Sequence, residues 1–552
     1  MTDGGVRGFI LAAGYGTRLA PVSDHLPKPL LPVPGGTVLD RAADALLAGG
    51  CSRIGVNTHH LPDLVAAHVR ARPDADRFTL FHEPAILGTG GALDHARAFL
   101  QDAATILLHN GDVLADVDVA ALLREHRRTG ALATLVLVDW PAVNSVRLDD
   151  DGAVLAIADG PAPCGRGRAL TYAGIAALDP ALLADIGPGF SSLIPPLVRA
   201  IAGRPGAVRG WAPADAGWTD LGTLLRYLAT VGDAGPLDGG QAQLVPITGQ
   251  GSDRRFWRLQ APGWSAVAMQ GPPDDPEFAR GAAIMRFLHG AGLGAAAVLA
   301  VHDDGRTLLA EDLGDQSLHA RAQSPDRAAA YAAVIDHLVR LQAATDDARA
   351  QCPEAVDRCL DQAMLAWETG YFSAAFLGRH GGLPEAELAA LAPGFAALNA
   401  HVAAQPRVLL HRDFQSTNIL LHEGRVRLVD VQGMRLGPLG YDAASLLWDP
   451  YVDLSDAERD ALLARFSAAV APRHGVSVDE AAAAVLAAGL QRVMQALGAF
   501  GFLGHAKGKT AFLVHIPRGL ANLRDLLARN RRAGGPVLPE LEAVLQRLPA
   551  GA

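Results

Sequence analysis

A change of pattern between Gly232 and Gln241 divides this chain of 552 residues into two parts. That stretch is rich in glycine, proline and aspartate and has no periodicity, which is typical of a connection between domains. A chain of this length also exceeds what one hydrophobic core usually supports. We therefore predict two domains, one at residues 1–235 and one at residues 242–552.

The first part alternates between short apolar runs and helical patterns. Strand-like runs occur at Phe9–Leu11, Ile54–Val56, Phe78–Phe81, Thr105–Leu108 and Thr134–Val138. Helical patterns separate some of them, at Leu39–Ala48 and Leu64–Val69. Such alternation predicts an α/β fold in which helices cover both faces of a mostly parallel sheet.

The second part has a different order of elements. Two strand-like runs, Arg255–Leu259 and Ala266–Met269, suit an antiparallel pair, and Phe278–Leu288 suits a helix. After Thr307–Ala310, a further strand candidate, the pattern is mainly helical from Asp326 onward. We predict a small sheet lobe followed by a larger helical lobe, which is an α+β arrangement.

Composition excludes several function classes. The formal net charge is −10, whereas a nucleic-acid binder usually carries a basic face, so we expect no nucleic-acid partner. The four cysteines lack CxxC spacing, and no secretory signal is visible at the start. The alanine-rich stretch Glu480–Gly504 carries Gln491 and Arg492 at its middle, which favours a buried helix over a membrane span. These features predict a cytoplasmic enzyme without a membrane partner.

A glycine-rich loop near the start is suited to binding phosphates. Gly14 and Gly16 follow an apolar strand, and glycine lets backbone N–H groups approach phosphate oxygens closely. Arg18 can donate to two phosphate oxygens, and Lys28 adds a compact positive charge. Leu19 stands where the dinucleotide-binding fingerprint needs its third glycine, so that motif is excluded. The loop predicts a nucleoside triphosphate site arranged for attack at the α-phosphorus.

Two carboxylates complete this predicted site. Asp112 follows the strand candidate at Thr105–Leu108, and Asp220 lies in the segment Gly217–Gly222. An aspartate at the carboxyl end of a parallel strand faces the ligand crevice. A pair of carboxylates together with substrate phosphates is a suitable environment for Mg²⁺.

These motifs resemble those of the sugar-1-phosphate nucleotidyltransferases over about Val6 to Val231. The resemblance implies a Rossmann-like nucleotidyltransferase domain in which Arg18 and Lys28 are the catalytic cations and Asp112 and Asp220 bind the metal. It also implies a set of nucleotide-binding residues: Leu11, Ala12, Gly14, Gly16, Thr17, Glu83, Gly88 and Thr89. This chemistry needs no general base, because the second pKa of a sugar phosphate is about 6 and the attacking oxygen is already charged.

The segment Glu83–Gly91 resembles the part of that family that reads the base. Glu83 could accept hydrogen bonds from guanine or from uracil, so spacing alone leaves UTP and GTP open. In its sequence motifs the chain resembles the N-acetylmuramate-1-phosphate uridylyltransferases more closely, which favours UTP. That resemblance lies in Glu-Pro followed by Thr-Gly-Gly, in Asn-Gly-Asp-Val and in Leu-Val-Leu-Val-Asp139.

A second motif, His411-Arg412-Asp413 followed by Asn418 and Asp430, has the spacing of a kinase catalytic loop. A neutral hydroxyl is a poor nucleophile, and Asp413 can accept its proton as the bond to phosphorus forms. Asn418 and Asp430 can hold Mg²⁺ on the nucleotide phosphates. The motif predicts transfer of a γ-phosphoryl group to a hydroxyl.

From about Leu244 onward the chain resembles the aminoglycoside and choline phosphotransferases, and most closely the anomeric kinases for N-acetylmuramate and N-acetylglucosamine. The resemblance implies a bilobal, protein-kinase-like domain. It also implies that Glu311-Asp-Leu313-Gly is the hinge that would hold adenine, with Glu311 and Leu313 as nucleotide-binding residues.

One departure concerns the usual kinase lysine, whose place is taken by Met269. The anomeric sugar kinases that the chain resembles show the same replacement, so it does not argue against activity. We predict that Ser252, Arg254 and Arg255 in the preceding loop supply the missing phosphate contacts.

The two motifs together predict a bifunctional enzyme of cell-wall sugar salvage. The second domain would phosphorylate the anomeric hydroxyl of N-acetylmuramate or N-acetylglucosamine with ATP, and the first would join the sugar 1-phosphate to UMP from UTP. Alternatives are a hexose kinase with a guanylyltransferase, a choline kinase with a cytidylyltransferase, and a scaffold with a degenerate kinase domain. The sequence leaves the sugar and the oligomeric state open.

Overall fold

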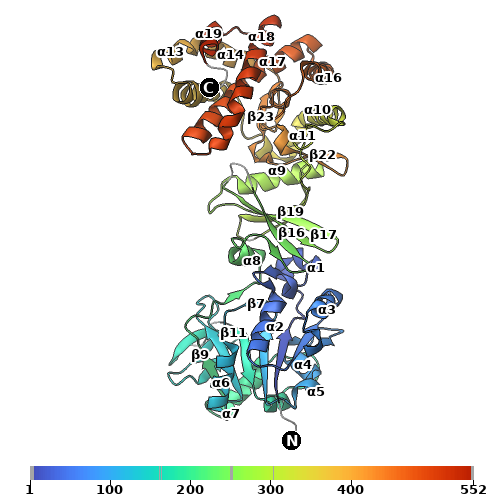
Figure 1. Cartoon of the computed structure of the whole chain (residues 1–552), viewed down its shortest axis with the longest axis vertical. Helices are drawn as coiled ribbons and strands as arrows, with labels where there is room; N and C mark the ends of the chain where they lie inside the picture. The colour runs from blue at the N-terminus through green and yellow to red at the C-terminus, as the bar shows by residue number, and fades with distance from the viewer. Residues whose placement is uncertain are drawn as a thin grey trace. The chain divides into compact units, whose positions relative to one another are not determined.

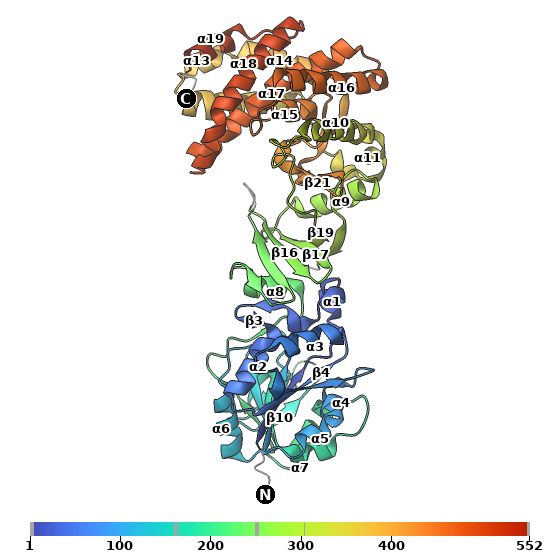
Figure 2. The same ribbon diagram turned by 45° about the vertical axis from the view of Figure 1, so that its right-hand side comes forward.

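The computed structural model describes residues 5–158, 160, 162, 165–248, 253–302 and 304–548 (Figures 1 and 2). The chain forms two compact units. The first unit comprises Met1–Pro272 with Leu299–Leu309, and the second comprises Pro273–Val298 with Ala310–Ala552. The predicted fold classes, a mostly parallel α/β part and a kinase-like α+β part, are confirmed.

The first unit is built around a nine-stranded sheet. Strand β1 runs parallel to both β4 and β6, and β4 runs parallel to β5. Strand β11 adds antiparallel pairs to β6, β8 and β9. The strands are β1 (Val6–Leu11), β4 (Arg53–Thr58), β5 (Phe78–His82), β6 (Thr105–Asn110), β8 (Ala133–Val138), β9 (Val146–Leu148), β10 (Val154–Ile157), β11 (Arg168–Leu178) and β12 (Val208–Trp211).

Helices cover both faces of this sheet, as the sequence predicted. Phe9 and Ile10 are adjacent on β1 but belong to different hydrophobic clusters, because successive side chains of a strand point to opposite faces. Thr37 begins α2 with a capping box, in which its hydroxyl accepts from the N–H of Asp40 at 3.1 Å. The helices are α1 (Val22–His25), α2 (Val38–Ala48), α3 (Pro62–Ala71), α4 (Gly88–His95), α5 (Arg97–Leu100), α6 (Val119–Thr129), α7 (Ile194–Gly203) and α8 (Leu224–Val231).

A second, six-stranded sheet follows α8, with the order β14-β15-β16-β17-β19-β18. The predicted antiparallel pair is confirmed as β16 and β17. The division between the two units falls within β18 and β19. The strands are β14 (Leu237–Asp238), β15 (Gln243–Ile247), β16 (Arg255–Ala261), β17 (Trp264–Gln270), β18 (Val298–Val301) and β19 (Thr307–Glu311).

Strands of the second sheet share a hydrophobic core with α8. Tyr227 and Val231 of α8 belong to the same buried cluster as Trp257 and Leu259 of β16, and Figures 1 and 2 both draw α8 beside this sheet. The Trp257 indole N–H also donates to the Gly232 carbonyl at 3.1 Å. The pattern change at residues 232–241 therefore lies inside one packed unit, and the contact boundary comes later, at Pro272.

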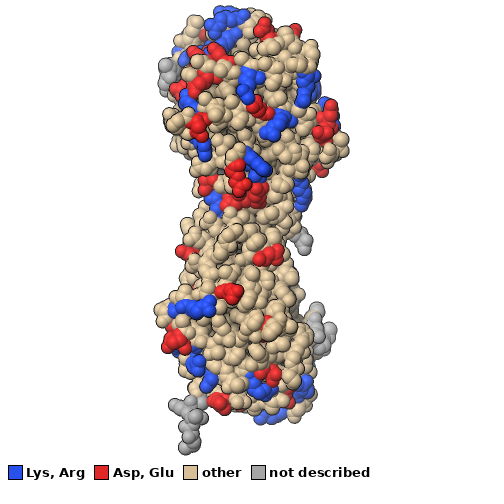
Figure 3. All heavy atoms as spheres, turned by 90° about the vertical axis from the view of Figure 1, so that its right-hand side faces the viewer, with Lys and Arg blue, Asp and Glu red and all other residues tan. Residues whose placement is uncertain are grey.

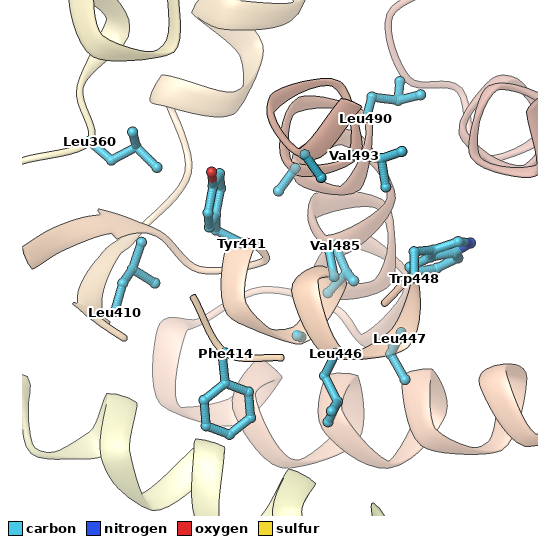
Figure 4. Packing of buried hydrophobic residues seen from close by; sticks show 14 of the residues in the cluster. Leu360, Leu410, Phe414, Tyr441, Leu446, Leu447, Trp448, Val485, Leu490 and Val493 are labelled. Atoms are coloured by element: carbon cyan, nitrogen blue, oxygen red, sulfur yellow. The ribbon is translucent and has the colours of Figure 1, made fainter. Parts of the chain in front are cut away.

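The second unit is mainly helical and is organised around α17 (Val478–His505). Ser477 caps this helix and Glu480 completes a capping box. By length and composition α17 could cross a membrane, but 78% of its most apolar window is buried inside the protein. The predicted buried helix is therefore confirmed, and Figure 4 shows its Val485, Leu490 and Val493 in the core.

The second unit also contains two short strand pairs and further helices. Two antiparallel pairs interrupt the helices, β20 with β23 and β21 with β22. These strands are β20 (Arg407–Leu410), β21 (Ile419–His422), β22 (Arg425–Leu428) and β23 (Arg435–Pro438). The helices are α9 (Phe278–Gly290), α10 (Arg327–Ala343), α11 (Thr345–Gln351), α12 (Gln362–Tyr371), α13 (Glu385–Ala390), α14 (Ala392–Ala403), α15 (Tyr441–Leu447), α16 (Asp456–His474), α18 (Ile516–Arg532) and α19 (Pro539–Arg547), with a π-helix at Phe372–His380.

Acidic and basic side chains are interspersed on the face of the molecule that Figure 3 shows. That mixture agrees with the modest negative net charge of the sequence.

Candidate active sites

A cavity of about 230 Å³ opens at the carboxyl ends of β1 and β6 in the first unit. Leu11 pairs with Asn110 across these parallel strands, so their ends meet at the same edge of the sheet. The cavity brings together many of the predicted nucleotide-site residues: Leu11, Ala12, Gly14, Gly16, Lys28, Glu83, Gly88, Thr89 and Asp112. Thr17 and Arg18 follow directly in an exposed 3₁₀ turn.

The glycine loop is shaped by two different requirements. Gly16 has φ +67°, a left-handed conformation that favours glycine, and a Cβ there would lie 3.1 Å from Lys28 Cγ. Gly14 has no atom within 4 Å of where a Cβ would stand, so it leaves open space beside the cavity. The loop therefore packs against Lys28 on one side and stays accessible on the other.

Asn57, at the end of β4, holds the same loop through a chain of buried hydrogen bonds. Its Oδ1 accepts from the Ala12 N–H at 2.6 Å, and its Nδ2 donates to Glu83 Oε1 at 2.8 Å. The other oxygen of Glu83 accepts from the Leu87 N–H at 2.9 Å, and Glu83 is fully buried. Sequence reasoning assigned Glu83 to the base and missed Asn57. In the structure Glu83 connects the two loops that line the cavity.

Gly88 and Thr89 begin α4 against a segment that sequence reasoning did not single out. A Cβ on Gly88 would lie 2.5 Å from the Ser191 carbonyl oxygen, so only glycine fits there. The exposed Thr89 accepts the Leu193 N–H at 2.9 Å through its hydroxyl. The backbone near the predicted base-reading segment is thus fixed by close packing.

The two predicted metal ligands of the first site lie on paired strands. Asp220 of β13 (Thr219–Asp220) pairs with Val113 of β7 (Val113–Leu114), and the Leu221 N–H donates to the Asp112 carbonyl. Lys28 Nζ lies 3.3 Å from Asp112 Oδ2. The structure therefore places two carboxylates and a predicted catalytic cation around one strand pair.

Arg18 reaches the same neighbourhood from the glycine loop. A Cβ on Gly222 would lie 2.7 Å from Arg18 Nη2 and 2.8 Å from Asp220 Oδ1, so both groups border this glycine. Arg226 also pairs with Asp220, at 2.7 Å. Its partnership with Asp220 could not be read from the motif alone.

A second cavity in the first unit, of about 660 Å³, adjoins Asp220. Trp140 and Trp218 line it with ring centroids 5.1 Å apart, and the Arg226 guanidinium lies 4.5 Å from the Trp140 ring. Arg168 lines it too and makes no ion pair or side-chain hydrogen bond with any residue that the structure describes. Sequence reasoning missed this cavity, although Trp218 stands two residues before Asp220.

In the second unit, the predicted catalytic loop follows β20. Asn418 Nδ2 donates to the Asp413 carbonyl at 3.0 Å, and the Val429 N–H donates to the Asn418 carbonyl at 3.1 Å. Asp430 follows with φ +62° and accepts from the Gln432 side chain. The hairpin β21–β22 thus brings the three predicted residues Asp413, Asn418 and Asp430 to one place.

Buried groups fix both ends of the loop. The Asp442 carboxylate accepts from the N–H groups of His411 at 2.6 Å and Arg412 at 3.0 Å. Asp449 accepts from the Ser416 N–H at 2.7 Å. Burial raises the pKa of Asp442 to about 7 and also raises the pKa of Asp449. Sequence reasoning gave Asp442 no role.

His411 itself is fully buried, and its Nε2–H donates to the Val429 carbonyl at 2.9 Å. Burial lowers its pKa, so the ring is neutral at physiological pH. His411 therefore ties the catalytic loop to the segment that carries Asp430.

The predicted hinge residues are engaged within the protein. Glu311 Oε2 accepts from Arg427 at 2.5 Å and from the Ala297 N–H at 3.0 Å. Burial alone would raise the pKa of Glu311, but the bond from Arg427 leaves it lowered. Leu313 is buried with 5% of its surface exposed. These contacts give Glu311 a structural role and leave the backbone as the part of the hinge that could contact adenine.

Arg254 and Arg255, two of the predicted replacements for the kinase lysine, lie in the first unit. Met269 of β17 pairs with Phe256 of β16. Arg255 pairs with Asp233 and lies 4.7 Å from the Trp257 ring, and Arg254 directly precedes β16. Ser252 lies outside the described residues.

Among the described residues, no group of three or more His, Cys, Asp or Glu side chains gathers into a metal site. Each candidate site instead offers one or two carboxylates. Mg²⁺ typically binds through one or two carboxylates together with substrate phosphates and water, so both donor sets fit that ion.

Comparison with known proteins finds similar proteins for each part of the chain. Residues 7–162 match the model of the nucleotidyl transferases, and residues 243–476 match that of the phosphotransferase enzyme family. An N-acetylmuramate alpha-1-phosphate uridylyltransferase of Caulobacter vibrioides is 32% identical over 233 residues, which are 40% of this chain and 93% of that protein. An N-acetylmuramate/N-acetylglucosamine kinase of Pseudomonas aeruginosa is 29% identical over 317 residues, which are 56% of this chain and 90% of that protein.

A third relative matches a shorter stretch. The catalytic subunit beta of a mannose-1-phosphate guanylyltransferase of Drosophila pseudoobscura pseudoobscura is 31% identical over 156 residues, which are 27% of this chain and 42% of that protein.

Proposed function

We propose that this chain, which belongs to the nucleotidyl transferases in its first part and to the phosphotransferase enzymes in its second, is a bifunctional enzyme of amino-sugar salvage. It phosphorylates the anomeric hydroxyl of N-acetylmuramate or N-acetylglucosamine with ATP. It then transfers a uridylyl group from UTP to the sugar 1-phosphate, giving a UDP-sugar and pyrophosphate. The observation that carries the proposal is that one chain spans nearly the whole length of both relatives.

In the first site, the nucleotide occupies the 230 Å³ cavity and the sugar phosphate occupies the 660 Å³ cavity that adjoins Asp220. The backbone of the loop at Gly14 and Gly16 holds phosphate oxygens. An oxygen of the sugar phosphate bonds to the α-phosphorus while the bond to pyrophosphate breaks. Lys28 and Arg18 reduce the repulsion between these anions, and their effect is on alignment and charge because the nucleophile arrives ionised.

In the second site, Asp413 accepts the proton of the anomeric hydroxyl. The hydroxyl oxygen bonds to the γ-phosphorus as the bond to ADP breaks. The buried carboxylates Asp442 and Asp449 hold the loop so that Asp413 keeps its position.

Mg²⁺ is the proposed cofactor of both sites. Asp112 and Asp220 would hold it in the first site, and Asn418 and Asp430 in the second, where the Asn418 amide nitrogen is already bonded and its Oδ1 remains for a cation. When bound, the ion neutralises phosphate charge. The other proposed ligands are ATP, UTP, an amino sugar and its 1-phosphate, with no nucleic acid and no membrane, and the proposed location is the cytoplasm.

A second candidate function keeps the architecture and changes the base and the sugar. The match to a mannose-1-phosphate guanylyltransferase makes GTP and a hexose phosphate the natural competitors. UTP is favoured because the uridylyltransferase relative aligns over 93% of its length, against 42% for the guanylyltransferase.

One matrix of assays tests the proposal. Purified protein with Mg²⁺ is given free sugars with ATP, and sugar 1-phosphates with UTP, GTP or CTP, and the release of ADP and of pyrophosphate is measured. We expect ADP with N-acetylmuramate or N-acetylglucosamine, and pyrophosphate only with UTP. Preference for GTP with a hexose phosphate would replace the proposal by its competitor. Absence of ADP with every sugar would remove the kinase half.

A further inference from the structure

Arg492 lies in the middle of α17, where the surrounding residues are mostly alanine, leucine, valine and glycine. Its exposed fraction is 6%. An isolated buried charge is costly, so such a residue needs specific partners. A charged residue is unusual in a helix as apolar as α17, and Arg492 has no role in either proposed reaction as described above.

The guanidinium of Arg492 has partners on three sides. Nε donates to Ser445 Oγ of α15 at 3.1 Å, and Nη1 donates to Gln495 Oε1, one turn along α17, at 2.7 Å. Nη2 donates to Gln415 Oε1 at 3.3 Å and lies 3.6 Å from Asp413 Oδ1. Two of these four partners belong to the catalytic loop, and the other two fix the guanidinium to the helical core.

This arrangement makes the two oxygens of Asp413 different. Oδ1 faces the Arg492 guanidinium. Oδ2 lies toward Gly433, 3.8 Å from where a Cβ of that residue would stand, and Gly433 ends the short turn that follows Asp430. The carboxylate therefore has a defined orientation, and Oδ2 is the oxygen left to accept a proton.

A buried carboxylate interacts electrostatically with the same guanidinium. Glu368 of α12 is fully buried, and the Tyr441 hydroxyl contacts both of its oxygens at 3.1 Å. Burial alone would lower the pKa of Arg492, but Tyr441, Asp413 and Glu368 leave it raised. Arg492 is therefore charged and pairs with the Asp413 carboxylate, whereas Glu368, whose pKa burial raises to about 7, lies 3.9 Å from the Arg412 guanidinium.

Phe414 anchors the loop from the other side. It directly follows Asp413, is fully buried, and appears in the core with Tyr441 and the α17 residues in Figure 4. The backbone of the loop is thus fixed by packing, while the Asp413 side chain depends on a polar contact.

We infer that Arg492 is a positioning residue of the kinase site, which orients the Asp413 carboxylate and the Gln415 side chain for reaction with the sugar hydroxyl. The inference rests on the proposed kinase function. It explains why α17 carries a buried arginine, and it connects this core helix to Asp413, the proposed proton acceptor, 79 positions earlier in the chain.

Arg492→Met tests the inference in the full-length protein, with Arg459→Met as the matched control. The two arginines have nearly equal side-chain exposure, 7% and 8%, but Arg459 pairs with Asp456 and Asp525 and contacts no catalytic residue among those described. We expect kcat for ADP formation to fall by about 30-fold or more in Arg492→Met, since misplacing a reacting group by 1 Å can cost about 100-fold. We expect KM for ATP to change less than threefold.

Two further measurements separate positioning from folding. Uridylyl transfer onto supplied sugar 1-phosphate should remain unchanged in both variants, and Arg459→Met should keep kcat within about twofold even where its melting temperature falls, because it lacks the contact with the loop. Arg492→Lys, which keeps the charge and loses the planar fork, should have an intermediate kcat. Arg492→Met with kcat within twofold of the parent overturns the inference, as does an equal loss of kcat in Arg459→Met. Failure of the parent protein to form ADP with any sugar would instead overturn the proposed function.

Discussion

In the proposed reactions, the two candidate active sites treat the attacking oxygen in opposite ways. The first surrounds it with cations, Lys28 and Arg18, which border the carboxylates Asp112 and Asp220. The second offers it a carboxylate, Asp413, held by a buried cation. An ionised phosphate oxygen needs charge neutralisation and a neutral hydroxyl needs a proton acceptor, so the side chains at each site follow from the state of the substrate.

The supports of the two sites differ as well. In the first, the Asp112 side chain is 39% exposed and the loop is held by Asn57. In the second, Glu368, Asp442 and Asp449 are almost completely buried, and burial raises the pKa of each. We therefore expect the second site to respond most to substitution and titration of its buried carboxylates. The first site should respond most to changes in its exposed charged side chains.

The largest expected effect comes from Asp413→Asn. Loss of the proton acceptor should lower kcat for ADP formation by about 1,000-fold, within the usual range for general-base catalysis. Uridylyl transfer onto supplied sugar 1-phosphate should be unchanged. Parallel assays of ADP and pyrophosphate check both statements, and a joint loss of the two activities would break the comparison.

Glu368→Gln should change how stability depends on pH. Burial raises the pKa of Glu368 to about 7 from 4.5, so the folded protein holds one more proton than the unfolded chain between those pH values. The free energy of unfolding of the second unit therefore falls as pH rises through this window, by about 3 kcal/mol for a shift of this size. Glutamine does not titrate, so the Glu368→Gln variant lacks this contribution to the pH dependence.

Thermal or urea unfolding of the parent and the Glu368→Gln variant at pH 5 and pH 8 measures this difference. The variant should gain stability relative to the parent as pH rises. Asp442 keeps its own raised pKa in both proteins, so part of the decline remains in the variant. Parallel curves for the two proteins would show that Glu368 is ionised in the fold at both pH values.

Lys28→Met sharpens the other side of the comparison. Removing this cation beside Asp112 should reduce uridylyl transfer by about 100-fold, comparable to the loss of one electrostatic donor in other enzymes. ADP formation should be unaffected. A kinase defect of similar size in this variant would mean that the two sites do not work separately.

Arg168→Gln should give the smallest effect and a selective one. Arg168 lines the second cavity without a partner among the described residues, and the lactyl group of N-acetylmuramate carries a carboxylate that N-acetylglucosamine lacks. A hydrogen bond to a charged group contributes about 1.5–3 kcal/mol, so KM for N-acetylmuramate 1-phosphate should rise at least tenfold. KM for N-acetylglucosamine 1-phosphate should stay within twofold, and Arg127→Gln on α6 serves as the control. Equal changes for both sugar phosphates would contradict a carboxylate-reading role.

The sequence predicted those parts of the sites that depend on local order. Gly14, Gly16 and Asp112 meet in one cavity because they follow the ends of predicted strands, and parallel strand ends share an edge. Lys28 reaches the same cavity from a 3₁₀ turn farther along the chain. The catalytic-loop residues meet because a short hairpin connects them. Their chemical roles remain predictions.

The sequence could not predict contacts between distant segments. Asn57 bonds to Ala12 and Glu83, so Glu83 also supports the loop, and its contact with the base stays a prediction. Arg492 was recognised as a sign that its helix is buried, but its approach to Asp413 depends on how α17 packs. The shared core of α8 and β16 likewise depends on packing across the predicted linker. The composition changes there, but residues on both sides of the linker belong to one hydrophobic cluster.

The central claim is that the first site uses an oxygen that is already ionised. Its most direct test is the pH dependence of kcat/KM for uridylyl transfer with a natural sugar 1-phosphate and with a 2-fluoro analogue, whose second phosphate pKa lies below the usual value of about 6. The account predicts that the acid limb of the profile moves down with the pKa of the substrate. An acid limb that stays at the same pH for both substrates would show that a protein group sets it, and would contradict the account.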